Sequence, residues 1–122
     1  MARYTAAIAI PAQLAGEAPG GISGALTQAL LAMGLEVEQA GRLQVGATTG
    51  TAKLGVKMRL VISWSPPNQH GEPVLASLEL LSREPMASGA PLSRSAIQLI
   101  LGGLAECIPH LQVVRCNGIS AN

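Results

Sequence analysis

The stretch Gly46–Gly55, GATTGTAKLG, has the glycines, threonines and lysine of a phosphate-binding loop. A P-loop needs the spacing GxxxxGK[ST] and a following helix, because the amides at the helix N-terminus face the phosphate. Here Gly46 and Gly50 are four apart, Lys53 lies three residues beyond Gly50, and a strand-like alternation follows. The spacing therefore favours a turn between two strands over a phosphate site.

Metal chemistry has few candidate ligands, because the chain has two histidines, two cysteines and no aspartate. His70 and His110 fall in separate predicted loops, and neither is followed by another His or Cys within two to four residues. Zinc needs three or four convergent ligands. We therefore expect two surface histidines, no metal site and no cofactor.

Cys107 and His110 are the pair closest to a nucleophile and its base. They are three residues apart but straddle Pro109. Nearness in sequence says little about such pairs, which meet through the fold. A cysteine in an apolar helix is more often packed and inert, and no GxSxG motif is present. The sequence therefore favours a protein that is not an enzyme, and we assign no catalytic residue.

The composition indicates a protein that hides part of its surface in a partner. Apolar residues make up 48% of the 122 residues and charged residues 12%, about half the usual share of charge. A symmetric homo-oligomer would explain the missing charge. The net charge of +1 argues against nucleic acid. No apolar run reaches the length of a membrane span, and we expect a cytoplasmic protein.

Residues Lys53–Trp64 carry the clearest structural signal, because apolar residues occupy every second position. A period of two indicates a strand with one buried and one open face. Tyr4 and Trp64 both fall on the buried parity, so neither can stack bases on an open sheet face. The same period recurs in three further segments and in a short last strand: Arg3–Ile10, Leu35–Ala47, 74–83 and Leu111–Cys116.

Two segments change to the helical period. In Ile22–Met33 the apolar residues recur on one helical face, and Gly34 is a natural stop. In Arg94–Ile108, which Ser93 is expected to cap, Leu99 lies off the buried stripe. Each mid-helix glycine there costs about 1 kcal/mol relative to alanine. Close approach to another backbone, in this chain or a neighbour, would explain such glycines.

Parity restricts how the strands pair. In the hairpin after the central strand, pairing Trp64 with Val74 sets Arg59 opposite Glu79. In the hairpin before it, the preferred register sets Glu38 opposite Arg59, with Leu35–Ala47 as one strand carrying a bulge or bend at residues 40–41. Leu60 and Leu78 are expected to lie beneath the second helix.

The order of elements, β-α-β-β-β-α, predicts an α+β fold in a single domain, 1–122. We expect a two-layer sandwich with a mainly antiparallel, curved sheet and both helices on one face. This layout is similar to helix-grip and TATA-binding-type sheets in the order of elements only. The open sheet face is expected to carry the charged residues Arg42, Lys53, Lys57, Arg59, Glu79 and Arg83.

The leading hypothesis is a small non-enzymatic interaction module that self-associates and binds a protein partner. The alternative is a carrier that holds an apolar small molecule between the sheet and the C-terminal helix. An uncharged helix surface would supply the interface of the module, and the open sheet face would supply specificity. The residues predicted for that interface are Leu99, Gly102, Gly103, Thr27 and Gln28.

Overall fold

The computed structural model describes residues 2–17, 20–49, 58–67, 71–84, 91–116 and 120–121. Within them the chain begins with a strand, continues with two helices and four strands, and ends with a helix and two short strands. The elements are β1 Ala2–Ile10, α1 Leu14–Glu17, α2 Gly21–Ala32, β2 Glu36–Ala40, β3 Gln44–Thr49, β4 Met58–Trp64, β5 Val74–Ser82, α3 Pro91–Cys107, β6 Gln112–Cys116 and β7 Ser120–Ala121.

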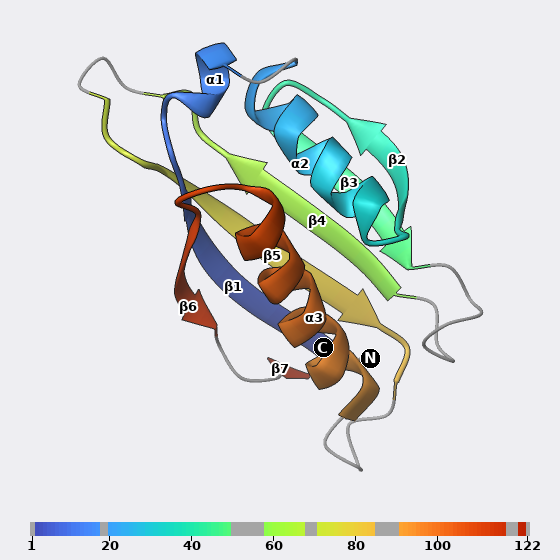
Figure 1. Ribbon diagram of the computed structural model, residues 1–122. Helices are drawn as coiled ribbons and strands as arrows, with labels where there is room; N and C mark the ends of the chain where they lie inside the picture. The colour runs from blue at the N-terminus through green and yellow to red at the C-terminus, as the bar shows by residue number, and fades with distance from the viewer. Residues whose placement is uncertain are drawn as a thin grey trace.

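The strands form one antiparallel sheet in the order β2-β3-β4-β5-β1-β6, and β7 pairs with the start of β1. The first strand of the chain therefore lies inside the sheet, between β5 and β6. Helices α2 and α3 lie over the same face (Figure 1), α2 against β2 and β3 and α3 against β1 and β5. The predicted α+β class, with an antiparallel sheet and helices packed against it, is confirmed.

The alternation along the central strands matches the burial of their side chains. In β4, Met58, Leu60, Ile62 and Trp64 are buried, whereas Arg59 and Ser63 are exposed. Strands β1 and β5 alternate in the same way, so one face of the sheet forms the floor of the core. Aliphatic side chains fill most of the described core, which also holds Tyr4, Met58 and Trp64, because the chain has no phenylalanine.

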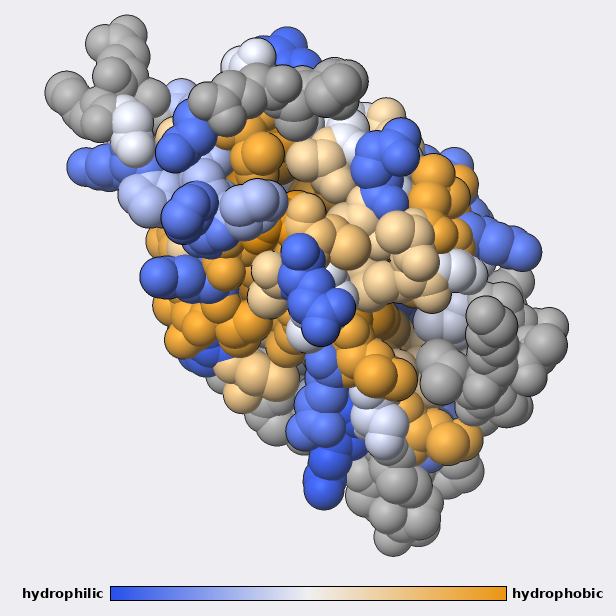
Figure 2. All heavy atoms as spheres, in the orientation of Figure 1, coloured by the Kyte–Doolittle hydropathy of each residue, from blue (hydrophilic) through white to orange (hydrophobic). Residues whose placement is uncertain are grey.

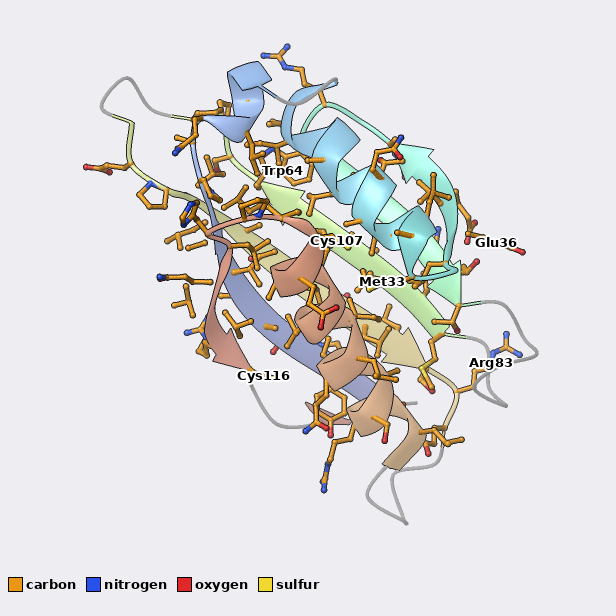
Figure 3. The ribbon with its side chains drawn as sticks, viewed as in Figure 1. Met33, Glu36, Trp64, Arg83, Cys107 and Cys116 are labelled. Atoms are coloured by element: carbon orange, nitrogen blue, oxygen red, sulfur yellow. The ribbon has the colours of Figure 1, made fainter. Side chains whose placement is uncertain are left out.

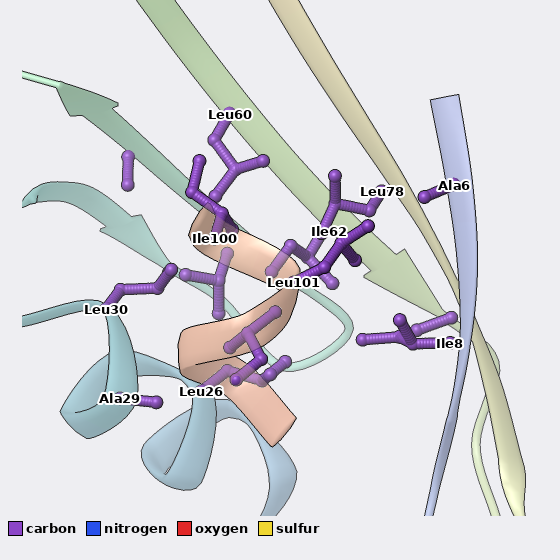
Figure 4. Packing of buried hydrophobic residues seen from close by; sticks show 14 of the residues in the cluster. Ala6, Ile8, Leu26, Ala29, Leu30, Leu60, Ile62, Leu78, Ile100 and Leu101 are labelled. Atoms are coloured by element: carbon purple, nitrogen blue, oxygen red, sulfur yellow. The ribbon is translucent and has the colours of Figure 1, made fainter. Parts of the chain in front are cut away.

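Helices α2 and α3 cover this core on the side opposite the sheet. Figure 4 shows Leu60, Ile62 and Leu78 of the sheet close to Ile100 and Leu101 of α3. All five are buried, and Leu60 has no exposed surface. The predicted position of Leu60 and Leu78 beneath the second helix is therefore confirmed.

Helix α2 ends where the sequence predicts. Gly34 has a φ of 86°, in the left-handed region that favours glycine. The Leu35 N–H donates to the Leu30 carbonyl at 3.1 Å, and the Gly34 N–H donates to the Leu31 carbonyl at 3.0 Å. These bonds satisfy carbonyls that the helix end would otherwise leave unpaired.

The segment Leu35–Ala47 is not one strand, and this expectation is wrong. It forms the hairpin β2–β3, closed by the Gly41 N–H donating to the Gln44 carbonyl at 2.7 Å. Val37 pairs with Ala47, and both have odd numbers, so the apolar alternation continues in phase through the turn. Alternation alone cannot separate such a hairpin from one long bent strand.

Both predicted registers pair the wrong residues, but they place the side chains on the correct face of the sheet. Arg59 pairs with Leu81 in β5 and with Thr48 in β3, so it lies opposite neither Glu79 nor Glu38. The β4–β5 register differs from the expected one by two residues. A shift of two returns every side chain to the same face, so the alternation is the same in both registers.

Candidate interaction surface

The outward side of α3 exposes apolar side chains and carries a single charged residue, Glu106. Leu99, at the middle of the helix, is 66% exposed, and Leu92 in the first turn is 40% exposed. The helix has two charged residues, Arg94 and Glu106, near its two ends. Figure 2 shows hydrophobic and weakly polar residues over much of α2, and a hydrophilic band along α3 with hydrophobic residues beside it. We define the α3 outer surface as the exposed residues Leu92, Ser95, Leu99, Gly102 and Glu106.

Two adjacent glycines in α3 have different surroundings. A Cβ atom added to Gly103 would collide with Sδ of Met33, which follows α2, so this glycine allows α2 and α3 to pack closely. Figure 3 shows Met33 on the side of α2 that is turned toward α3. A Cβ atom added to Gly102 would meet nothing within 4 Å. Packing within the described chain therefore explains Gly103 and leaves Gly102 unexplained.

Helix α2 also presents an uncharged outer side. None of its residues is charged, and Leu31 is 50% exposed. Gln28 is exposed, whereas Thr27 is half-buried and its Oγ1 has no hydrogen-bond partner among the described residues. Thr27 and Gln28 thus lie on the helix layer, as does Leu99 of α3, but on a different helix.

The outer strand β6 is a second exposed apolar region. All five of its residues are exposed, including Val113 and Val114. Its pairing with β1 is interrupted by a register shift between Ala7 and Ile8. The other outer strand, β2, has a similar shift against β3 between Val37 and Gln39. Bulges at both edges disfavour the addition of another strand.

Two of the charged residues predicted for the open sheet face lie on its described strands. Arg59 and Glu79 lie on it, and Glu79 Oε2 is 3.6 Å from Nε of Arg3, an ion-pair distance too long for a hydrogen bond. Arg42 and Arg83 are exposed just outside the strands, in the β2–β3 turn and after β5. Lys53 and Lys57 lie outside the described residues.

A buried carboxylate holds the first turn of α3 in place. Glu84, just after β5, is only 5% exposed. Its oxygens accept hydrogen bonds from the Leu92 N–H at 2.9 Å and from the Ser93 N–H and Oγ–H at 2.7 Å each. Burial alone would raise the pKa of Glu84, but these hydrogen bonds outweigh it and lower the pKa below its ordinary value.

The prediction that Ser93 caps the helix is therefore wrong. The helix begins at Pro91, and the Ser93 hydroxyl donates to Glu84 instead of accepting from a backbone N–H. Glu84 takes the role of the cap from eight residues before Leu92. A local capping pattern spans about three residues, so no local signal in the sequence could have identified Glu84.

A second contact fixes the same end of α3 to the sheet. The Arg94 Nε–H donates to the hydroxyl oxygen of Tyr4 in β1 at 3.0 Å. This hydrogen bond raises the pKa of Arg94. Arg94 therefore lies on the flank of α3 that faces β1, whereas Gly103 lies on the flank that faces α2.

Among the described residues, no three side chains of the metal-binding types cluster. Cys107 ends α3 and Cys116 ends β6, and both are exposed, free thiols on different elements (Figure 3). His110 lies in the turn after α3 with a φ of 66°, and His70 lies outside the described residues. Of Gly46–Gly55, only 46–49 are described, and they belong to β3 rather than to a loop before a helix.

The comparisons with known proteins give no family for the chain. No protein-family model matches it, and a search of curated proteins finds no match. In the described part of the chain, none of the helices has the length and apolar character that crossing a membrane requires.

Proposed function

We propose that this protein is a small, non-enzymatic interaction module that self-associates and binds a protein partner. The observation that carries this proposal is the helix layer, where Leu31 and Leu99 are each at least half exposed and charges are almost absent. Large contiguous apolar patches are uncommon on monomeric proteins and mark interaction sites. We assign affinity to this layer.

The open sheet face is the proposed source of specificity toward a partner protein. It presents Arg3, Arg59 and Glu79 among small and apolar side chains. Charged groups at the rim of an interface steer association and exclude wrong partners more than they add affinity. The free thiols Cys107 and Cys116 fit a reducing compartment, and we propose a cytoplasmic location on that ground.

Multi-angle light scattering on the purified chain tests self-association. We expect a particle of at least twice the 12.4 kDa chain mass in the micromolar range. A particle at the chain mass across that range would end this proposal, and the low charge of the helix layer would need another cause.

The competing proposal is a carrier for an apolar small molecule between the sheet and α3, with a curved sheet and a helix-grip-like layout. Native mass spectrometry of the freshly purified protein separates the two. A co-purified small molecule that leaves on denaturation would favour the carrier. A ligand-free oligomer would favour the module.

A further inference from the structure

We infer that the occupant of the α3 outer surface is a second copy of this chain, whose own α3 packs antiparallel and crosses near Leu99 and Gly102. This inference rests on the proposed self-association and adds the surface, the symmetry and the residues in contact. Three observations carry it: an unused space at Gly102, the placement of charges along α3, and the position of Leu99.

The first observation is the space at Gly102. A glycine inside a helix is less stabilising than alanine, and Gly102 has room for a Cβ atom. At its neighbour Gly103 the Met33 side chain occupies the position that a Cβ atom would take, so the two glycines have different surroundings. A side chain from outside the chain would use the space that Gly102 leaves open.

The second observation concerns symmetry. A two-fold axis that makes α3 antiparallel to its copy pairs residues whose numbers have a constant sum. Leu99 and Gly102 have their midpoint between residues 100 and 101, and Arg94 and Glu106 have theirs at residue 100. One axis therefore brings each Leu99 to the copy's Gly102 and each Arg94 to the level of the copy's Glu106. The contact of Leu99 with Gly102 and the pairing of Arg94 with Glu106 therefore fit the same two-fold axis. A self-complementary interface requires such a shared axis.

The third observation is the placement of the axis on the helix. Leu99 is the middle residue of α3 and the most exposed of its large apolar residues. An axis close to it lets the two helices overlap along most of their length. The absence of a side chain at Gly102 permits a short distance between the helix axes.

The position of Arg94 on the flank of α3 agrees with an oblique crossing of the two helices. Arg94 lies toward β1, where its Nε–H is held by Tyr4, while Glu106 points outward. A crossing angle near −50°, the commonest for helix pairs, displaces the copy's helix toward the Arg94 flank at this level. The bond to Tyr4 orders the guanidinium and leaves its terminal amino groups available to a carboxylate.

The experiment measures the dimer dissociation constant by sedimentation velocity for matched leucine variants. Leu99→Glu places an unpaired carboxylate in the interface and should weaken the dimer at least about 100-fold. The control is Leu75→Glu, because Leu75 is 65% exposed but lies on the open face of the sheet. We expect Leu75→Glu to change the dissociation constant less than about threefold, as for a site outside the interface.

A charge exchange tests the geometry. Glu106→Arg places an arginine near the copy's Arg94 at both ends of the interface and should weaken the dimer roughly tenfold. Adding Arg94→Glu to this variant should recover most of that loss. Circular dichroism of each variant confirms the fold. Because Arg94→Glu also breaks the bond to Tyr4, the recovery cannot come from better folding.

The outcomes separate this inference from the proposed function. A wild-type monomer overturns both. A wild-type dimer that is insensitive to Leu99→Glu, or equally sensitive to Leu75→Glu, overturns the α3 geometry and leaves self-association intact. Weakening by Glu106→Arg without recovery in the double variant would exclude the antiparallel pairing of Arg94 with Glu106.

Discussion

The inward and outward sides of α3 are made of similar residues and differ in what covers them. Ile97, Ile100 and Leu104 face the sheet and are almost completely buried, whereas Leu99 is largely exposed and Leu92 is 40% exposed. One side of the helix is therefore packed against the sheet, and among the described residues nothing covers Leu99 on the other side. Apolar character alone does not distinguish a core residue from an interface residue, because the distinction depends on what is packed against it.

The largest expected effect is on the inward side. Leu104→Ala should lower the free energy of unfolding by about 2–5 kcal/mol, because it leaves a cavity between helix and sheet. Leu60→Ala, on the sheet side of the core, should act similarly. Leu99→Ala should change the monomer's stability by less than about 0.5 kcal/mol. Urea titrations at low protein concentration measure all three, and equal losses for Leu99 and Leu104 would contradict the difference between the two sides.

The next largest effect is expected at Glu84, which anchors the first turn of α3. Glu84→Gln should cost about 1.5–3 kcal/mol, because it weakens hydrogen bonds between a buried carboxylate and the first turn of α3. The pKa of Glu84 is lower in the folded state than its ordinary value. The stabilisation it supplies is therefore present above the ordinary pKa of a glutamate and is lost as the pH falls through the folded pKa.

Acid titration checks this sign. Wild type should lose more stability than Glu84→Gln when the pH falls from about 5 to about 3. The two curves should converge at the acid end. Parallel curves would mean that the Glu84 carboxylate does not contribute through its charge.

Gly102 and Gly103 allow the same comparison between an open and an occupied side of α3, with a smaller expected effect on stability. Gly103→Ala pushes a methyl group into Met33 and should destabilise the monomer by about 1 kcal/mol, after the gain in helix propensity is included. Gly102→Ala enters open space and should stabilise the monomer by up to about 1 kcal/mol. Both are best measured in the Leu99→Glu background, where association does not add to stability. Effects of the same sign would show that the surroundings of the two glycines are alike.

The smallest effect lies on the open sheet face. Glu79→Gln removes the exposed ion pair with Arg3 and should cost about 0–1 kcal/mol. High salt should reduce that difference further. A loss of several kcal/mol would mean that this face is covered and that a partner contacts the sheet as well as the helices.

Hydropathy periods identified the main elements and their buried faces, including the inward sides of β1, β4, β5 and both long helices. They could not fix strand register, because a shift of two residues keeps every face unchanged. They also could not divide Leu35–Ala47, since the β2–β3 hairpin keeps the apolar residues in phase through its turn. The helix periodicity placed Leu99 off the buried stripe but could not separate Gly102 from Gly103.

The sequence by itself determined the class of this protein: an aliphatic core, an antiparallel sheet with one buried face, and a helix layer almost without charge. These properties follow from composition and local periodicity, which act over a few residues. The tertiary structure decided which strands are neighbours, that Glu84 anchors α3, and that Met33 occupies the space beside Gly103 and not beside Gly102. Those contacts join elements distant in sequence or separated by loops, and only the packed chain brings them together.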